Sequence, residues 1–141
     1  MTIGSGCYGC DADNSLGLKL VVERVAGERR VLGTWVPGKE FQGPANHLHG
    51  GVSSTLLDEA MARLAHVLDG QHSITATLNV RFRRPVPLDG RPLTIEAWRD
   101  SDPPLSSRRH RLFGRITLAD GTPAVEAEGL FVRLPPTSPA S

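Results

Sequence analysis

The chain has 141 residues, of which 39% are hydrophobic and 22% charged, proportions typical of one globular domain and not of a disordered or fibrous chain. Sixteen Lys and Arg against fifteen Asp and Glu leave a net charge of +1, so the sequence lacks the positive excess that favours a nucleic-acid or membrane partner. No apolar run approaches the roughly 20 residues of a bilayer span, the first residues lack the pattern of a signal peptide, and two cysteines cannot form a disulfide scaffold, so we expect a cytoplasmic protein.

The first elements in chain order are a loose segment and two strands. Residues 1–14 are rich in glycine and polar side chains, so we expect them to be a loose lead-in to a single domain that spans residues 1–141. Residues 16–25 and 30–36 have the composition of two β-strands joined by a short turn that contains Gly27.

Only one segment has a clear helical period, and it follows the second strand. Apolar residues recur at Leu56, Ala60 and Leu64 with others beside them. They make a stripe wider than about 100° and predict a helix over residues 51–68. Gly70 supplies the stop. At 1.5 Å per residue the helix would be about 27 Å long, enough to cross a small sheet.

Four further strand candidates follow the helix. Residues 74–83 alternate strictly, so the series that starts at Ile74 lies on one face of a strand and the series that starts at Thr75 on the other. The remaining candidates, bounded by turn sequences, are residues 93–99, 110–118 and 124–134, before a tail at 135–141 that we expect to fray. One long apolar helix and about six strands, without a second helix, predict an α+β fold in which the sheet wraps around the helix.

Two short motifs lack the neighbouring elements or residues that their usual function requires. Residues 4–9 match the G-x-G-x-x-G string, but no strand precedes it and no βαβ unit follows, so we expect no nucleotide there. Cys7 and Cys10 have the spacing of half a zinc site, yet completing it with His47 and His49 would need a wider histidine spacing. We therefore expect no metal or cofactor and interpret the cysteines as packing or loop residues.

The segment from Asn46 to Val52 runs straight into the helix and contains the pair Gly50 and Gly51. Glycine lets a ligand approach the backbone without a Cβ in the way. The first N–H groups of a helix have no partner within it and carry the positive end of its dipole. Such a start can bind a carbonyl oxygen that becomes negative during a reaction, although a Gly-Gly pair can also simply end a loop.

Two neighbouring acids, Asp58 and Glu59, lie inside the predicted helix on different faces. Glu59 is four residues before Arg63, in the orientation that favours a surface ion pair. Asp58 falls at the edge of the apolar stripe and has no basic residue three or four positions away. A carboxylate in that position without a cation is a candidate for chemistry, so we assign the catalytic role to Asp58.

At this point the sequence resembles a known family. His49-Gly50-Gly51 with an acid nine residues after the histidine resembles the signature of hotdog-fold acyl-CoA thioesterases of the phenylacetyl-CoA thioesterase (PaaI-like) group. Residues 78–87, which contain an Arg-Pro pair, are similar to the family's third strand, and residues 124–132 to its last strand. The segment that begins at Cys7 resembles an N-terminal element of one subgroup.

The resemblance implies a hotdog fold and a homodimer whose sheets join side by side, often paired again into a tetramer. Active sites would lie at the dimer interface. Gly50 or Gly51 would donate its amide to the thioester carbonyl, and His49 would shape the site. Asp58, contributed by the other subunit, would be the nucleophile or general base, with the hydroxyl of Thr75 assisting near the water.

One position departs from the pattern. Many members of the family have Asn or Gln six residues before the motif histidine, where this chain has Gly43. Gln42 or Asn46 would then have to supply the amide, and Asn46 is our candidate for contact with the substrate.

Thioester hydrolysis fits these residues because a thioester is already activated and needs a polarised carbonyl and a carboxylate, with no metal or cofactor. The phosphates of CoA would need cations. The candidates are Arg81, Arg83, Arg84 and residues 108–111. Two alternatives stay open, a non-catalytic acyl-CoA-binding protein and an enoyl-CoA hydratase or dehydratase. The sequence does not choose the acyl chain.

Overall fold

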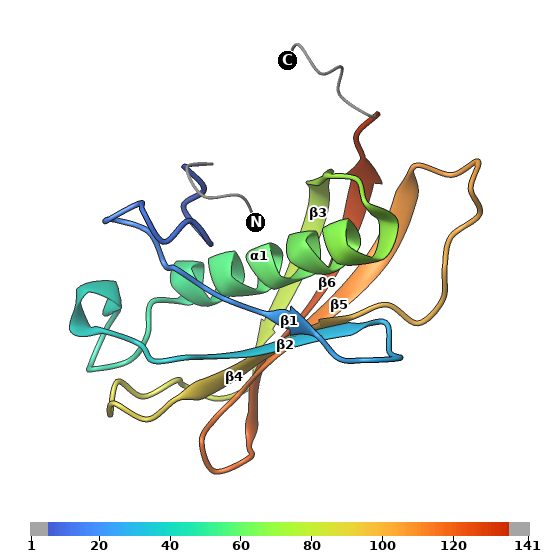
Figure 1. The fold of residues 1–141 in the computed structure, drawn as a ribbon. Coiled ribbons are helices and arrows are strands. Elements are labelled where there is room, and N and C mark those ends of the chain that lie inside the picture. The colour runs from blue at the N-terminus through green and yellow to red at the C-terminus, as the bar shows by residue number, and fades with distance from the viewer. Residues whose placement is uncertain (1–5, 136–141) are drawn as a thin grey trace.

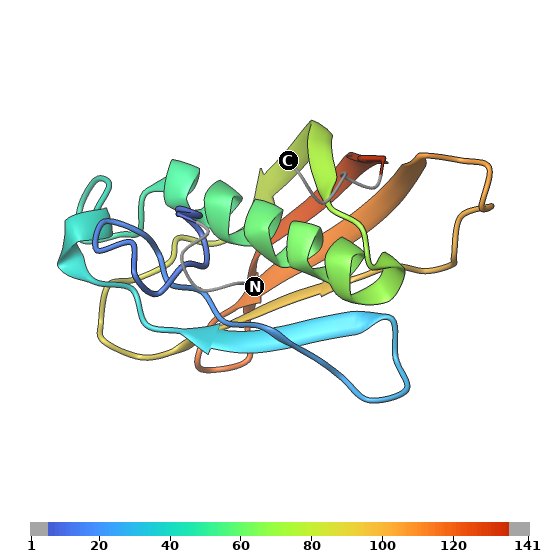
Figure 2. The same ribbon diagram turned by 45° about the horizontal axis from the view of Figure 1, so that its top comes forward.

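The computed structural model, which describes residues 6–135, has one long helix packed against one six-stranded antiparallel sheet (Figure 1). The expected α+β hotdog architecture is confirmed. The sheet curves around the helix, which crosses one face of it (Figure 2). The sheet order is β1-β2-β4-β5-β6-β3. In chain order the elements are β1 (Glu23–Arg24), β2 (Arg30–Trp35), the 3-10 turn η1 (Lys39–Phe41), α1 (Gly50–Asp69), β3 (Ser73–Phe82), β4 (Leu93–Trp98), β5 (Arg109–Thr117) and β6 (Pro123–Arg133).

Helix α1 forms where the apolar period predicts it and ends at Gly70, which adopts the left-handed conformation with φ 70°. Its buried face packs on the sheet because glycines there leave room. A Cβ at Gly114 of β5 would lie 3.1 Å from Leu57 Cδ2, and a Cβ at Gly129 of β6 would lie 3.4 Å from Met61 Sδ. The buried residues of the helix are Ser53, Leu56, Leu57, Ala60, Met61, Leu64 and Ala65.

The strand expected at residues 16–25 is mostly absent, because only Glu23–Arg24 pair with β2. The preceding residues are extended, but their backbone groups bond elsewhere. The N–H groups of Leu18 and Leu20 donate to carbonyls of the N-terminal turn, and the Leu18 carbonyl accepts from the Trp35 indole at 2.8 Å. Tertiary contacts thus replace the sheet ladder that the composition predicted.

The described part of the expected lead-in is packed rather than loose. Residues 6–17 form turns beside the first half of α1 (Figures 1 and 2). The buried carboxylate of Asp11 holds these turns, since its oxygens accept from the Gly6 N–H at 2.6 Å and the Asp13 N–H at 2.9 Å. Residues 1–5 and most of the expected tail, 136–141, lie outside the described residues.

Strand β3 does not alternate strictly, because a β-bulge lies between Thr75 and Thr77. Two residues three apart in a regular strand point to opposite faces. Here Thr75 reaches α1 through a side-chain hydrogen bond, and Leu78 also packs against the core. The extra residue therefore changes which face is apolar along the strand, so the expectation of one apolar series from Ile74 is wrong. Ile74 is 54% exposed.

Candidate active site

The N-terminus of α1 is built by a loop that folds back on η1. The N–H of His49 donates to the Phe41 carbonyl at 2.9 Å, and His49 then serves as the N-cap of the helix. Its ring Nδ1 accepts from the N–H of Gly51 at 2.9 Å. The N–H of Gly50 has no acceptor among residues 6–135. The structure therefore distinguishes two glycines that the sequence left equivalent, because only the Gly50 amide remains available to a ligand.

Asp58 lies two turns further along α1 and is half-buried. Its Oδ1 accepts from the hydroxyl of Thr75 on β3, so the structure brings these two predicted residues together. No Lys, Arg or His pairs with Asp58 in the described part of the chain. A carboxylate that is held by one hydroxyl and has no cation beside it is suited to accept a proton or to attack a carbonyl carbon.

The open amide and the carboxylate do not meet within one copy of the chain. Asp58 follows Gly50 by eight positions, and a helix rises 1.5 Å per residue, so the two residues are about 12 Å apart along the helix axis. A group that donates to the thioester carbonyl oxygen, or that attacks the carbonyl carbon, must lie within about 3 Å of that atom. One carbonyl group therefore cannot contact the Gly50 amide and Asp58 of the same protomer.

Glu59 does not form the expected surface ion pair with Arg63. Its carboxylate faces the N-terminal turn, where Oε1 lies 3.6 Å from Cys7 Sγ. The helix spacing was suitable for the predicted pair, but the packed turn supplied partners on that side of the helix. Sequence reasoning missed this contact because it joins residues 52 positions apart.

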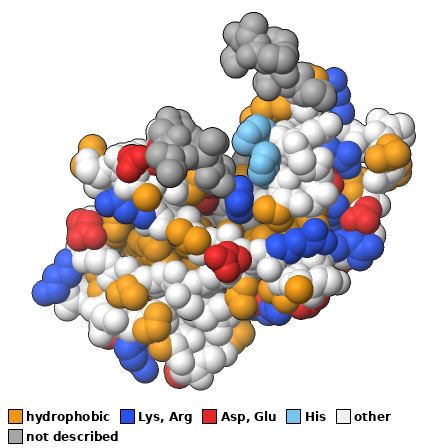
Figure 3. Space-filling view, viewed as in Figure 1, with side chains coloured by type: hydrophobic (Ala, Val, Ile, Leu, Met, Phe, Trp, Pro, Cys, Tyr) orange, Lys and Arg blue, Asp and Glu red, His pale blue; other side chains and the backbone are white. Residues whose placement is uncertain are grey.

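A groove of about 640 Å³ lies beside the helix start and includes His49, Val52 and Gln42 in its wall. Hydrophobic side chains gather across the middle of this face of the molecule (Figure 3). The other lining residues come from the N-terminal turns, the end of β2 and η1, and no sequence period joins them. They are Tyr8, Ser15, Leu16, Gly17, Leu18, Lys19, Trp35, Val36, Glu40 and Phe41.

The structure shows the surroundings of Gly43, where many family members have the side-chain amide of Asn or Gln. A Cβ on Gly43 would lie 3.0 Å from the Cα of His49, so a side chain there would require the backbone at the helix cap to shift by a few tenths of an ångström. Asn46 is exposed in the loop with a positive φ of 60° and does not line the groove, and its contact with the substrate stays a prediction. Gln42, in contrast, does line the groove.

The predicted arginines fall into paired and unpaired groups. Arg83 pairs with Glu126 at 2.9 Å, and Arg111 of the 108–111 segment pairs with Glu128 at 2.5 Å. Arg81 and Arg84 are exposed and have no ion pair among residues 6–135. Both flank the end of β3, where the Phe82 ring lies 3.4 Å from the position of a Cβ on Gly50. Arg81 and Arg84 are therefore on the segment that lies next to the open amide, whereas Arg108 and Arg109, which are also exposed and without an ion pair among residues 6–135, lie at the start of β5.

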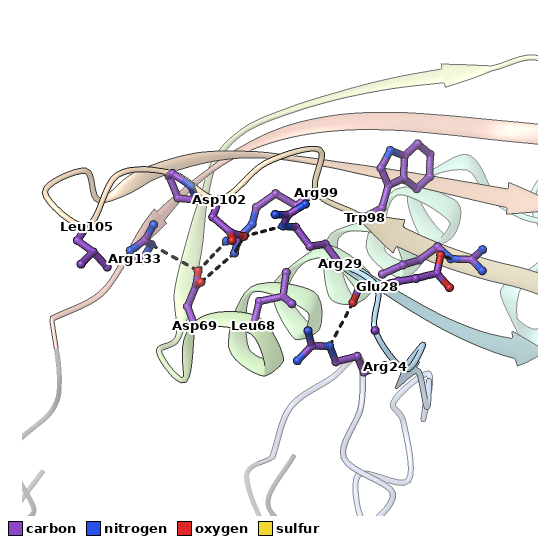
Figure 4. Close-up of a pocket in the computed structure, with 13 residues that line it drawn as sticks. Arg24, Glu28, Arg29, Leu68, Asp69, Trp98, Arg99, Asp102, Leu105 and Arg133 are labelled. Atoms are coloured by element: carbon purple, nitrogen blue, oxygen red, sulfur yellow. Dashed lines mark hydrogen bonds and ion pairs between the residues drawn. The ribbon is translucent and has the colours of Figure 1, made fainter.

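A second cavity, of about 790 Å³, lies at the other end of α1 and contains none of the predicted site residues (Figure 4). Its charged groups bind one another. Arg99, only 5% exposed, donates to both oxygens of Asp69 at 2.9 and 3.1 Å and to Asp102 at 2.9 Å. Arg133 lies 3.5 Å from Asp69. This network ties the end of the helix to the sheet and offers no nucleophile.

The network predicts a loss of stability in acid through His110. Burial lowers the pKa of His110, and Arg99 and Arg133 lower it further, against the opposing effect of Asp69. The Arg99 guanidinium can only donate hydrogen bonds. The neutral His110 ring therefore accepts from Arg99 at Nδ1 and donates from Nε2 to the Ser73 hydroxyl. As the pH falls, His110 is protonated at a higher pH in the unfolded chain than in the folded chain. The free energy of unfolding therefore decreases as the pH drops below about 6.5.

The measurement is the thermal midpoint of the wild type and of His110→Gln between pH 7.5 and pH 5. Gln can accept from Arg99 and donate to Ser73 without titrating, so the variant should lose less stability in acid. The pKa of His66 is also lowered, chiefly by burial, so part of the dependence should remain. Parallel curves for the two proteins would contradict the assignment.

Comparison with known proteins agrees with this fold. Residues 45–101, which contain the helix start, Asp58 and Thr75, match the family model described as the thioesterase superfamily. The chain is 32% identical over 125 residues to acyl-coenzyme A thioesterase THEM4 of Bos taurus, covering 88% of this chain and 49% of that protein. It spans about half the length of the curated relatives of that name.

Solved structures show the same architecture. A thioesterase superfamily protein that is 36% identical has a TM-score of 0.78, with 89% of this chain and 62% of that chain covered. The PaaI protein of the E. coli phenylacetic acid degradation operon, 20% identical, shares the fold with a TM-score of 0.68 over 78% of this chain and 76% of that chain. The molecule is thus a hotdog-fold protein. Its sequence and structure are similar to those of members of the thioesterase superfamily, the family that the His-Gly-Gly motif resembles.

Within the described residues, no helix has the length and apolar character needed to cross a membrane.

Proposed function

We propose that the protein hydrolyses an acyl-CoA thioester to the free acid and CoA. The observation that carries this proposal is the Gly50 N–H, which is open at the positive end of α1 next to a groove lined by both apolar and polar side chains. An oxygen that becomes negative in the transition state is stabilised by such a donor. The curated relatives of this chain are named acyl-coenzyme A thioesterases, which supports the same chemistry.

In the proposed reaction the thioester carbonyl oxygen accepts from the Gly50 N–H. The Thr75 hydroxyl binds Oδ1 of Asp58 and leaves Oδ2 for the reaction. As a general base, Asp58 takes a proton from water while the water oxygen bonds to the carbonyl carbon. As a nucleophile, it forms an anhydride that water then opens. In either case the bond from carbon to sulfur breaks and the thiolate leaves as CoA.

We further propose that the site is shared between two copies of the chain, because one copy cannot bring Gly50 and Asp58 to one carbonyl. Strand β3 is suited to join them. It is an edge strand of ten residues, and its side chains Ile74 and Phe82 are 54% and 55% exposed. Pairing of two such edges would satisfy their backbone groups and cover these side chains. A dimer of such dimers and a cytoplasmic location stay predictions.

Mixing two inactive variants tests the shared site. Asp58→Asn and Gly50→Pro each remove one half of it, so we expect neither variant alone to hydrolyse CoA esters. After the two are unfolded and refolded together, about half of the dimers would contain one copy of each variant, and each of these would hold one intact site. About a quarter of the wild-type activity should return. If no activity returns while light scattering shows dimers, the two groups do not share a site.

We propose that Arg81 and Arg84 bind the phosphates of CoA. They are exposed, lack carboxylate partners among the described residues and adjoin Phe82, which lies next to the open amide. Arg83 is less available because Glu126 holds it.

The direct test of the function is thiol release, followed with a colorimetric reagent, from phenylacetyl-, benzoyl-, butyryl- and octanoyl-CoA. We expect release from at least one ester, and the panel then identifies the acyl class. Saturable binding of these esters without release would favour a binding protein. Loss of the absorbance of an enoyl-CoA would favour a hydratase, although His49 caps the helix nine residues before Asp58 and is not placed to act with it.

A further inference from the structure

The N-terminal turn and α1 bring together three groups that bind metals in other proteins. The sulfurs of Cys7 and Cys10 and a carboxylate oxygen of Glu59 all lie within 4.8 Å of one another. The sulfurs are not joined in a disulfide, and all three residues are half-buried. The sequence supplied only the cysteine pair, because the third residue lies on the helix, 52 positions from Cys7.

The separation of one sulfur from the carboxylate is that of two ligands in a tetrahedral zinc site. With Zn–S of about 2.3 Å and Zn–O of about 2.1 Å, tetrahedral geometry places a sulfur and an oxygen ligand about 3.6 Å apart. The distance from Cys7 Sγ to Glu59 Oε1 is 3.6 Å. The two cysteines also have the C-x-x-C spacing with which one turn presents two thiolates to one ion.

The turn is shaped around the carboxylate. Gly9 is buried between the two cysteines, and a Cβ on it would lie 2.8 Å from Cγ and Cδ of Glu59 and 2.9 Å from Oε2. Glycine leaves the room that the Glu59 carboxylate occupies, and any other residue at position 9 would make that flexible side chain shift.

The charges of the cluster favour a bound cation. A divalent ion replaces the thiol protons and balances most of the negative charge of two thiolates and one carboxylate.

We propose that Cys7, Cys10 and Glu59 bind one Zn²⁺ ion through two thiolates and a carboxylate. Binding releases the thiol protons, and water completes the coordination because the residues are only half-buried. The ion joins the N-terminal turn to the middle of α1. Tyr8 and residues 15–19 of the same segment line the groove at the helix start, so the metal holds one wall of that groove in place.

The test is direct zinc binding to the full-length, reduced protein, measured by titration with Zn²⁺ against a chromophoric chelator. We expect about one ion per chain for the wild type. Substitution of a residue around a ligand already weakens metal binding by roughly 10–100-fold, so loss of a ligand in Glu59→Gln or Cys10→Ser should weaken it by at least that much. Glu23→Gln, which changes an exposed acid on β1, is the matched control and should bind zinc as the wild type does.

Two further measurements keep the result independent of folding and of the proposed activity. Glu59→Asp retains a carboxylate and should recover part of the affinity that Glu59→Gln loses. Cobalt(II) in place of zinc should produce the absorption bands of cobalt–thiolate bonds in the wild type, weaker in Cys10→Ser. The proposal is overturned if the reduced wild type binds no zinc, or if the Glu59 and Cys10 variants bind it as tightly as the control.

Discussion

Asp58→Asn is expected to lower the turnover of CoA-ester hydrolysis by about 10²–10⁴-fold and to leave the fold intact. Asn has the size of Asp and its amide oxygen can still accept from the Thr75 hydroxyl, so the contact between α1 and β3 is kept. Only the negative charge is lost, and with it the ability to take a proton or attack the carbonyl carbon. The measurement is thiol release at saturating substrate, with the thermal midpoint measured in parallel.

The control for Asp58→Asn is Glu23→Gln, which removes the charge of an acid on β1 that lies outside the proposed site. It should hydrolyse CoA esters at the wild-type rate. A single turnover in water labelled with ¹⁸O then tests whether Asp58 is the nucleophile. Label in the Asp58 carboxylate would show an anhydride that water opens at the Asp58 carbon, whereas label only in the released acid would show that water attacks the acyl carbon. Asp58→Asn with undiminished turnover would remove Asp58 from the mechanism.

Gly50→Pro is expected to lower turnover by about 10²–10³-fold through the loss of a single N–H group. Proline lacks that hydrogen but is favoured at the first position of a helix, which is the position of Gly50. The residue before it must be extended, and His49 already has φ −61° and ψ 131°. The helix should therefore form in this variant with its oxyanion donor missing.

The matched control for Gly50→Pro is Gly50→Ala, which adds a Cβ and keeps the N–H. That Cβ would meet the Phe82 ring at 3.4 Å, an ordinary packing distance, so steric effects of a side chain are measured separately. We expect Gly50→Ala to retain most of its turnover. Equal turnover of the two variants would show that another group polarises the carbonyl, and the Gly51 amide, released from His49, would be the next one to test.

Local patterns in the sequence were sufficient for the architecture. The recurrence of Leu56, Ala60 and Leu64 places the helix to within one residue at each end, since the apolar period of a helix is written in consecutive residues. The last three strands also match to within about one residue for the same reason. The bulge in β3 and the short β1 were not predictable, because both depend on partners distant in the sequence.

The sequence by itself determined the residue types at the candidate site: a glycine pair at a helix start, an acid without a local cation, and a hydroxyl on the next strand. Only the tertiary structure decided how they are used. It left the Gly50 amide open by capping Gly51 with His49, set Thr75 against Asp58, and placed Glu59 between two cysteines. These outcomes depend on directions of hydrogen bonds and on contacts between distant segments, which residue spacing along the chain does not encode.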